Sequence, residues 1–303
     1  MKVFLMDKVL LIDFNNAVWR ASIGFAPKKI AMAPQPSNDE WGSYGAPEPT
    51  PEPKKVDDTF VIIFNFFRNL RPLIEQFSPD KCFAVLEGHP AFRFDLFAGY
   101  KADRIIKRAA KKESMDKFYA SHNEIVRLLQ HLPITIARAA NYEADDTIAS
   151  LCENMKDEKL TVLSNDSDYI QLLQRDYKDI TIFNPIKKEV MVAPDYPYVA
   201  WKCLAGDKSD SIPSILKPKK VIEAMADASA FKKFMDVEEN RANFNMNRQL
   251  IEFRNVPEEE IVLQEGVRNF DILKEEFSKM EFQSIINEKS WEKYTKTFDC
   301  LRY

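Results

Sequence analysis

Short apolar runs alternate along the chain with longer amphipathic stretches. The runs with the length of buried strands are 9–13, 81–87, 133–138, 159–166 and 179–183, and 189–193 is expected to form a hairpin with the last of them. Apolar positions recur at helical spacing in the segments 60–77, 93–131, 143–155 and 167–174, and the chain after 193 is expected to be mostly helical. This alternation predicts an α/β fold, with a mostly parallel central sheet covered by helices.

Composition along the chain predicts two regions. Residues 1–193 carry the expected strands and form the α/β core, whereas 194–303 are expected to be mainly helical and to pack on that core. Within the core, residues 25–55 hold many prolines, which is typical of an irregular surface insertion. A chain of 303 residues is long enough for this arrangement.

Several protein classes are excluded by composition. The 7 glycines form neither of the common glycine-rich phosphate loops. The apolar run 60–67 is too short to span a membrane, and Asp7 and Lys8 interrupt the apolar core that a signal peptide would need. The 4 cysteines lie far apart and make no zinc spacing with the 3 histidines, so reduced thiols are expected. We expect a monomer in the cytoplasm.

Carboxylates follow four of the expected strands. Asp13 and Glu87 end the first and the second. The sequence EADD at 143–146 opens the helix after the third, and Asp166 and Asp168 follow the fourth. Acids also suit the first turn of a helix, where the macrodipole stabilises each by roughly 0.3–1 kcal/mol. In parallel sheets the carboxyl ends of the strands meet at one edge, so four separate segments bring acids to the same place. A cation site explains this convergence better than four independent helix or turn positions do.

The chemistry of the acids and of a nearby basic stretch points to phosphate. Oxygen ligands without a His/Cys cluster favour Mg²⁺ or Mn²⁺ over zinc. Two such ions about 4 Å apart can bind a phosphodiester, activate water and stabilise the leaving oxygen. The net charge is −4, yet residues 93–112 carry seven basic residues against two acids. That stretch is either a solvated helix face or a phosphate-binding stripe. Together the two features indicate a metal-dependent nuclease.

Five stretches resemble the 5′ nuclease (flap endonuclease) family, which includes the small bacteriophage 5′ nucleases, phage RNase H and the N-terminal nuclease domain of bacterial DNA polymerase I. They are LLIDFNNAVWRA, FRFDLFAGYKADR (92–104), YEADDTIASL (142–151), VLSNDSDYIQLL (162–173) and LAGDKSDSIPSI (204–215). They occur in the family's order and span most of the chain. The absence of a polymerase region makes the chain similar to the stand-alone phage type.

This resemblance implies a fold and an activity. The fold is the PIN-like 5′ nuclease fold, with a helical arch at about 93–120 and a helix–turn–helix-like segment that binds duplex in the C-terminal part. The implied enzyme is a divalent-metal-dependent 5′-3′ exonuclease and flap endonuclease of DNA replication and repair, with RNase H activity, which leaves a 5′ phosphate and a 3′ hydroxyl. Its cofactors would be two or more Mg²⁺, with Mn²⁺ as a substitute. Its partners would be DNA with a 5′ flap or 5′ end, RNA/DNA hybrids and replication proteins.

The resemblance also assigns the metal site. The acids at the family's metal positions are Asp13, Glu87, Glu143, Asp145, Asp146, Asp166, Asp168, Asp207 and Asp210. Asp13, Asp145 and Asp146 would hold one cation most directly. Glu87 departs from the family, which usually has aspartate at this position and a loop about one residue longer.

Basic and aromatic residues match the family's nucleic-acid contacts. Lys101 and Arg104 would contact the scissile phosphate and act in catalysis, and Tyr100 would stack on a base near the cut. The other implied contacts are Arg93, Lys107, Arg108, Lys111, Lys217, Lys219 and Lys220. The glycine-rich turn that often holds potassium in the family is reduced here to SILKPKKV, so no potassium ion is carried over.

Two other functions fit parts of the pattern. A PIN-type ribonuclease uses a related acidic sheet edge, but the long basic arch and the GDKSDSIP segment disfavour it. A catalytically silent homologue that binds DNA junctions would share the fold. It would have no reason to keep so many acids that repel DNA.

Overall fold

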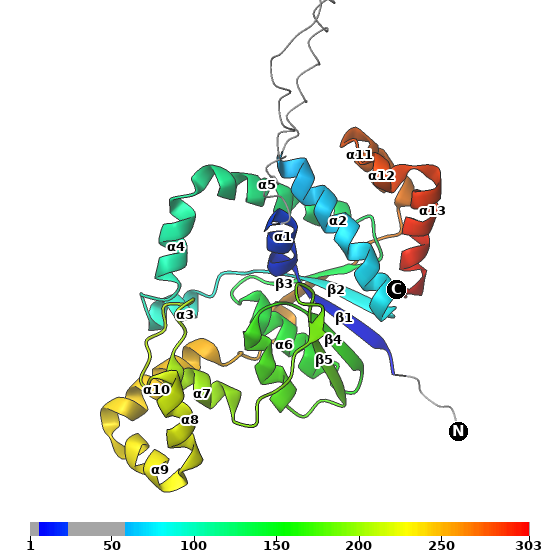
Figure 1. The fold of residues 1–303 in the computed structure, drawn as a ribbon. Coiled ribbons are helices and arrows are strands. Elements are labelled where there is room, and N and C mark those ends of the chain that lie inside the picture. Colours follow the sequence, from blue (N-terminus) through cyan, green and yellow to red (C-terminus); the bar gives the residue numbers. More distant parts are fainter. Residues whose placement is uncertain (1–5, 24–57, 303) are drawn as a thin grey trace, which may run out of the picture.

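The computed structural model describes residues 6–23 and 58–302, so the expected insertion at 25–55 lies outside the described residues. The chain forms one seven-stranded sheet in the order β6-β5-β4-β1-β2-β3-β7 (Figure 1). Its strands are β1 (Lys8–Asp13), β2 (Lys81–Leu86), β3 (Thr135–Ala139), β4 (Lys159–Leu163), β5 (Asp179–Asn184), β6 (Glu189–Val190) and β7 (Ile261–Gln264). Within the described residues no helix is both long and apolar enough to cross a membrane.

The five central strands are parallel, as the sequence predicts. β1 lies in the middle and pairs with β2 and β4, and β3 and β5 extend the parallel array on either side. Val9, Leu10, Leu11 and Ile12 of β1 are each at most 3% exposed. A strand that is apolar on both faces needs a helical layer on each side, because neither face can meet water.

Helices cover both faces of the sheet. The helices of the core are α1 (Phe14–Ile23), α2 (Asp58–Phe77), α3 (Ala91–Leu96), α4 (Ala102–Ala109), α5 (Lys112–Leu129) and α6 (Ala144–Asn154). One apolar cluster joins α1, α2 and α5 to one face of the sheet, and a second joins α6 to the other (Figure 1). The α/β prediction, with a mostly parallel sheet between helices, is confirmed.

The basic stretch forms an arc beside the sheet. The expected helix over 93–131 is divided into α3, α4 and α5, and Lys101 adopts a left-handed conformation (φ 54°) at the start of α4. Figure 1 shows α4 running away from the sheet and α5 returning to α1 and α2. No residue of α4 is buried, so this arc has the exposed surface expected of the helical arch.

The C-terminal part consists mostly of helices. These are α7 (Tyr198–Ala205), α8 (Pro218–Ala226), α9 (Ala228–Asp236), α10 (Glu238–Ile251), α11 (Phe270–Lys279), α12 (Gln283–Ile286) and α13 (Glu288–Lys296). The short 3₁₀ helices are η1 (Ser167–Gln174), η2 (Glu258–Glu260) and η3 (Thr297–Cys300). α7 packs against α8 and α10, and α11–α13 join the cluster that contains α2.

Three sequence predictions require correction. β7 was not predicted: it lies in the region expected to be mainly helical, and it pairs antiparallel with β3 through backbone groups distant in sequence. Its four residues are partly or fully exposed, so no buried apolar pattern marked it. The hairpin after β5 is real, but β6 ends at Val190 rather than at 193. The helix expected from Ser167 is 3₁₀ rather than α.

Gly88 fixes the loop that follows β2. Its amide donates to the Tyr142 carbonyl at 3.0 Å, which joins this loop to the segment between β3 and α6. A Cβ at this position would lie 2.1 Å from the Ala139 carbonyl oxygen and 2.4 Å from that of Tyr142. Both neighbours are backbone atoms, so the two segments approach this closely only with glycine here.

Gly88→Ala is therefore expected to lower the free energy of unfolding by about 1–3 kcal/mol or more, as overpacking against fixed atoms does. Urea denaturation measures the change. Gly99→Ala is the matched control, because a Cβ there meets only the side chain of Phe97, which can move. Equal stability of the two variants would contradict the close-approach explanation.

Candidate active site

The carboxyl edge of the sheet gathers acids from four elements. Asp13 is the last residue of β1, and its carboxylate accepts hydrogen bonds from the Asn16 amide (3.0 Å) and the Ser164 hydroxyl (2.9 Å). Glu87 follows β2 and accepts from the Ala144 amide (3.3 Å) at the start of α6. The strand ends and the helix N-terminus therefore meet at one place, as the spacing of the acids predicts.

Two further acids complete this group. Asp145, in the first turn of α6, accepts from the Tyr169 hydroxyl at 2.7 Å. Asp166 follows β4 and is the residue that caps the start of η1. Its carboxylate accepts a hydrogen bond from the Asp168 amide at 3.0 Å. We call Asp13, Glu87, Asp145 and Asp166 the acidic edge. None of these four carboxylates forms an ion pair in residues 6–23 and 58–302.

The acidic edge is strained electrostatically. Burial is the main cause that raises the pKa of Asp13 to about 6, and the negative charge of Asp166 adds to it. Burial and then the Glu143 charge raise the pKa of Glu87 to about 7. The pKa of Asp145 is raised by burial and then by the charges of Asp166 and Asp13, with Glu87 adding to these. Neighbouring carboxylates thus repel one another where burial, partial for three of the four, reduces their contact with water.

The donor set of the acidic edge fits a divalent cation. Only oxygen atoms are offered, which suits Mg²⁺ or Mn²⁺, and a cation would remove the repulsion. Across the described residues, no three acids, histidines or cysteines close around one point as a complete cage. Mg²⁺ does not require one, because it usually takes one or two carboxylates and keeps several waters.

A second group of acids is neutralised by a buried lysine. Lys202 of α7 is 6% exposed and forms ion pairs with Asp168 and, at 2.8 Å, with Asp207. Burial tends to raise the pKa of Asp207. The charge of Lys202 and hydrogen bonds from Lys202 and Ser209 outweigh it and bring the pKa down to about 2. These two acids therefore already have a cation, which distinguishes them from the acidic edge.

Lys202 was not among the sequence-predicted site residues. Its signal was available, since it is the single charged residue in the otherwise apolar helix YVAWKCLA. A lysine on an apolar helix face is buried only when it is paired, so its carboxylate partners could have been sought nearby.

A third group surrounds Arg93. Its guanidinium is 2% exposed and donates to Asp146 through two nitrogens, at 2.6 and 2.8 Å, and to Glu143 at 2.9 Å. The Arg254 amide also donates to Asp146, at 2.8 Å. The structure therefore places Asp146 in a buried ion pair rather than at the acidic edge. Successive residues of a helix point about 100° apart, so Asp145 and Asp146 cannot both face the strand ends.

Lys101 and Arg104 lie between the arc and the acids. Lys101 forms ion pairs with Glu143 and, at 3.9 Å, with Asp210. Arg104 forms an ion pair with Asp210 at 2.7 Å and donates to the Ser209 carbonyl at 3.1 Å. Both side chains keep some exposure, 18% for Lys101 and 37% for Arg104, so an incoming anion can reach them.

Two expected nucleic-acid contacts are buried. Tyr100 is 2% exposed, and its hydroxyl donates to Glu143 at 2.8 Å while its ring meets Phe94 edge-on. It has no free face for a base in this structure, and Arg93 has no access to a phosphate. The remaining expected contacts are all exposed, on or beside α4 and at the start of α8: Lys107, Arg108, Lys111, Lys217, Lys219 and Lys220.

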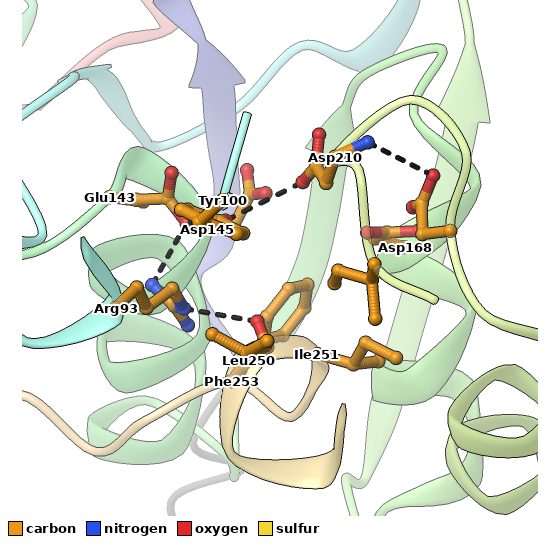
Figure 2. Close-up of a pocket in the computed structure, with 11 residues that line it drawn as sticks. Arg93, Tyr100, Glu143, Asp145, Asp168, Asp210, Leu250, Ile251 and Phe253 are labelled. Atoms are coloured by element: carbon orange, nitrogen blue, oxygen red, sulfur yellow. Dashed lines mark hydrogen bonds and ion pairs between the residues drawn. The ribbon is translucent and has the colours of Figure 1, made fainter. Parts of the chain in front are cut away.

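A pocket forms where the neutralised acids meet the acidic edge. Figure 2 shows Glu143, Asp145, Asp168 and Asp210 on its polar side. Leu250, Ile251 and Phe253, at and just after the end of α10, lie against it from the other side. The C-terminal part therefore completes this pocket, to which it also contributes Asp207 and Asp210.

A family model described as the N-terminal, resolvase-like domain of 5′-3′ exonucleases matches residues 8–200, more than half of the chain. The chain belongs to the 5′-3′ exonuclease family. The resemblance found in the sequence motifs is thereby confirmed, and the family's nuclease and flap endonuclease functions are those that the motifs indicate.

Relatives of this exonuclease-family chain include a polymerase and a nuclease. The chain is 29% identical over 170 residues to DNA polymerase I of Chloroflexus aurantiacus, which covers 50% of this chain and 17% of that protein. It is 28% identical over 163 residues to the 5′-3′ exonuclease of Mycoplasmopsis pulmonis, covering 50% of this chain and 52% of that one. The matches thus span under a fifth of the polymerase and about half of the exonuclease.

Solved structures with a similar fold come from bacteriophage T5. The T5 5′-exonuclease with bound zinc has a TM-score of 0.56 and 14% identity, and the match covers 96% of this chain and 98% of that one. The T5 flap endonuclease with DNA and metal ions gives a TM-score of 0.55 at 14% identity, covering 96% and 97%. At this identity the likeness shows the fold alone.

Lys202→Met should lower the free energy of unfolding at pH 7 by about 3 kcal/mol, because removing one partner leaves buried charges unpaired. The pKa of Asp207 is lowered in the folded state, so its pairing stabilises the protein above about pH 4, and this contribution is lost as the pH falls toward 2. The difference between variant and wild type should therefore shrink below pH 4. Urea denaturation at a series of pH values measures it.

The control for this series is Lys208→Met, which removes an exposed lysine six residues further along the chain. It should leave stability unchanged at every pH. A deficit in Lys202→Met that stays constant from pH 7 to pH 3 would mean that Lys202 acts through packing and not through its charge.

Proposed function

We propose that the protein is a structure-specific 5′ nuclease that cleaves DNA carrying a 5′ flap or a 5′ end. The observation that carries the proposal is the acidic edge, in which Asp13, Glu87, Asp145 and Asp166 repel one another without an ion-pair partner in the described residues. Bound cations would stabilise these four carboxylates by neutralising their charge. The exposed basic arc supplies the charge that attracts a nucleic acid.

Divalent cations, two or more Mg²⁺ in this proposal, would be held by the acidic edge and would supply activation of water and neutralisation of phosphate charge. Asp13, Asp145 and Glu87 would hold them most directly, because none of these three carboxylates forms an ion pair within the described residues. Mn²⁺ is expected to substitute, since it prefers the same oxygen ligands.

Lys101 and Arg104 would bind the scissile phosphate. Each is now paired with an acid, Lys101 mainly with Glu143 and Arg104 with Asp210. A phosphate placed between the arc and the acidic edge would share these cations, which offset the charge that gathers on its oxygens during cleavage. Glu143 and Asp210 would hold the two cationic side chains in position until the phosphate arrives.

The proposal also includes 5′-3′ exonuclease and RNase H activities at the same site. A phosphodiester near a free 5′ end would meet the same acids and cations whether its strand is DNA or RNA, so 5′-3′ exonuclease and RNase H activities are included. The products would carry a 5′ phosphate and a 3′ hydroxyl. Replication proteins are the natural partners and the cytoplasm is the expected location.

Asp145→Asn should reduce cleavage of a 5′-end-labelled flap duplex at least about 100-fold, because it removes a charged cation ligand while keeping the side-chain shape. Release of short 5′ fragments should require Mg²⁺ or Mn²⁺ and should stop with chelator. Binding of the duplex, measured by fluorescence anisotropy, should remain.

The matched control is Asp103→Asn, an exposed acid in the first turn of α4 that should leave cleavage unchanged. Tight binding of the flap duplex by the wild type without cleavage under either cation would refute the enzyme and support the silent junction-binding homologue. Cleavage by Asp145→Asn at the wild-type rate would refute the role of the acidic edge.

A further inference from the structure

Tyr169 of η1 is a buried residue that contacts the acidic edge. Its side chain is 0% exposed, and its hydroxyl donates a hydrogen bond to Oδ1 of Asp145 at 2.7 Å. Asp145 itself is partly exposed and lines the pocket at the acidic edge, whereas Tyr169 does not line that pocket. The hydroxyl therefore approaches the Asp145 carboxylate from the protein interior.

The charge of the donor distinguishes Asp145 from its neighbour in α6. The Arg93 guanidinium binds Asp146 and neutralises it. A phenol is uncharged at neutral pH, and toward an ionised carboxylate it acts only as a donor. It therefore orients the Asp145 carboxylate and leaves its negative charge available to a cation. The second oxygen, Oδ2, makes no hydrogen bond or ion pair within residues 6–23 and 58–302.

Packing holds the Tyr169 ring in place. Its centroid lies 5.6 Å from that of Phe253, in the apolar cluster that joins α6 to the sheet. The side chain of Gln171, two residues further along η1, accepts from the Phe253 amide at 3.0 Å and donates to the Ile251 carbonyl at 3.3 Å. These bonds connect η1 to the segment after α10, so the Tyr169 hydroxyl has a fixed position from which to hold Asp145.

A second carboxylate of the acidic edge is held in the same way. The Ser164 hydroxyl, also 0% exposed, donates to Oδ2 of Asp13 at 2.9 Å and accepts from the Asp166 amide at 3.1 Å. Ser164 and Tyr169 belong to one short segment, which runs from the end of β4 into η1. This segment thus supplies uncharged donors to acids of two other elements, β1 and α6.

Satisfying a buried hydroxyl would be the other explanation of the contact between Tyr169 and Asp145. Among the residues that the structure describes, however, the hydroxyls of Tyr177 and Tyr294 are buried without a hydrogen-bond partner. A buried tyrosine hydroxyl in this fold therefore does not by itself require a carboxylate beside it. The contact is better explained by what it does for Asp145.

We propose that Tyr169 is a positioning residue of the cation site, whose hydroxyl holds the Asp145 carboxylate in the orientation that binds a divalent cation. This inference rests on the proposed function in one respect, that the acidic edge holds cations. Tyr169 touches neither the cation nor the phosphate and acts through Asp145. Partners of metal ligands at this distance typically change metal affinity about 10–100-fold.

The test is titration of the whole chain with Mn²⁺ in the absence of nucleic acid, followed by the electron paramagnetic resonance signal of the free ion. Tyr169→Phe keeps the ring and removes the hydroxyl, so the Mn²⁺ affinity should fall about 10-fold or more. Tyr294→Phe is the matched control, because it removes a buried hydroxyl that has no partner, and it should bind Mn²⁺ as the wild type does. In an Asp145→Ala background, Tyr169→Phe should cause no further loss, since its effect passes through Asp145.

Equal Mn²⁺ affinity of Tyr169→Phe and the wild type would overturn the proposal, as would a further loss of about 10-fold in the Asp145→Ala background. A thermal melt should show Tyr169→Phe folded. Failure of that variant to fold would assign the hydroxyl to stability and would also overturn the proposal.

Cleavage of the flap duplex separates this inference from the proposed function. With an active nuclease, Tyr169→Phe should need about 10-fold more Mn²⁺ for its half-maximal rate and should approach the wild-type rate at saturating Mn²⁺. A wild type that binds Mn²⁺ without cleaving would refute the nuclease, and the Mn²⁺ titration would still decide the role of Tyr169. A wild type that binds no Mn²⁺ would refute both.

Discussion

Repulsion among carboxylates at the carboxyl edge of the sheet is the constraint on which the rest of the structure depends. Parallel strands end at the same edge, so Asp13, Glu87 and Asp166 are brought together by topology, and the first turn of α6 adds Asp145. Burial then raises the pKa of each of these acids. A protein that keeps such a group must neutralise it, and a bound cation does so with the groups already present.

The acids of this region fall into two groups, those in ion pairs and those without them. Those that join the C-terminal part to the core carry their own cations: Lys202 pairs with Asp168 and Asp207 and attaches α7, while Arg93 pairs with Asp146 and donates to the Leu250 carbonyl at the end of α10. Asp13, Glu87 and Asp166 at the strand ends form no ion pair within residues 6–23 and 58–302. The buried ion pairs thus connect the C-terminal part to the core, whereas the acids without ion pairs are the proposed ligands of the catalytic cations.

Sequence reasoning succeeded where the signal is local. The buried parallel strands, the acidic start of α6 and the basic stretch each show in a short window, and together they indicated the fold and the acidic edge. It failed where the role of a residue depends on the direction of its side chain or on contacts with residues distant in sequence. Asp146 is one residue from Asp145 but points into the Arg93 ion pair, and Tyr100 is buried by its bond to Glu143. β7 forms only because β3 offers a free edge, which no local pattern reveals.

The most direct measurement is the anomalous scattering of manganese in crystals of this protein grown with Mn²⁺. A peak in contact with carboxylates of the acidic edge is predicted, with none beside Asp146, whose oxygens belong to Arg93. A well-ordered acidic edge without manganese, or manganese bound to Asp146 with Arg93 displaced, would contradict the division of the acids on which this account depends.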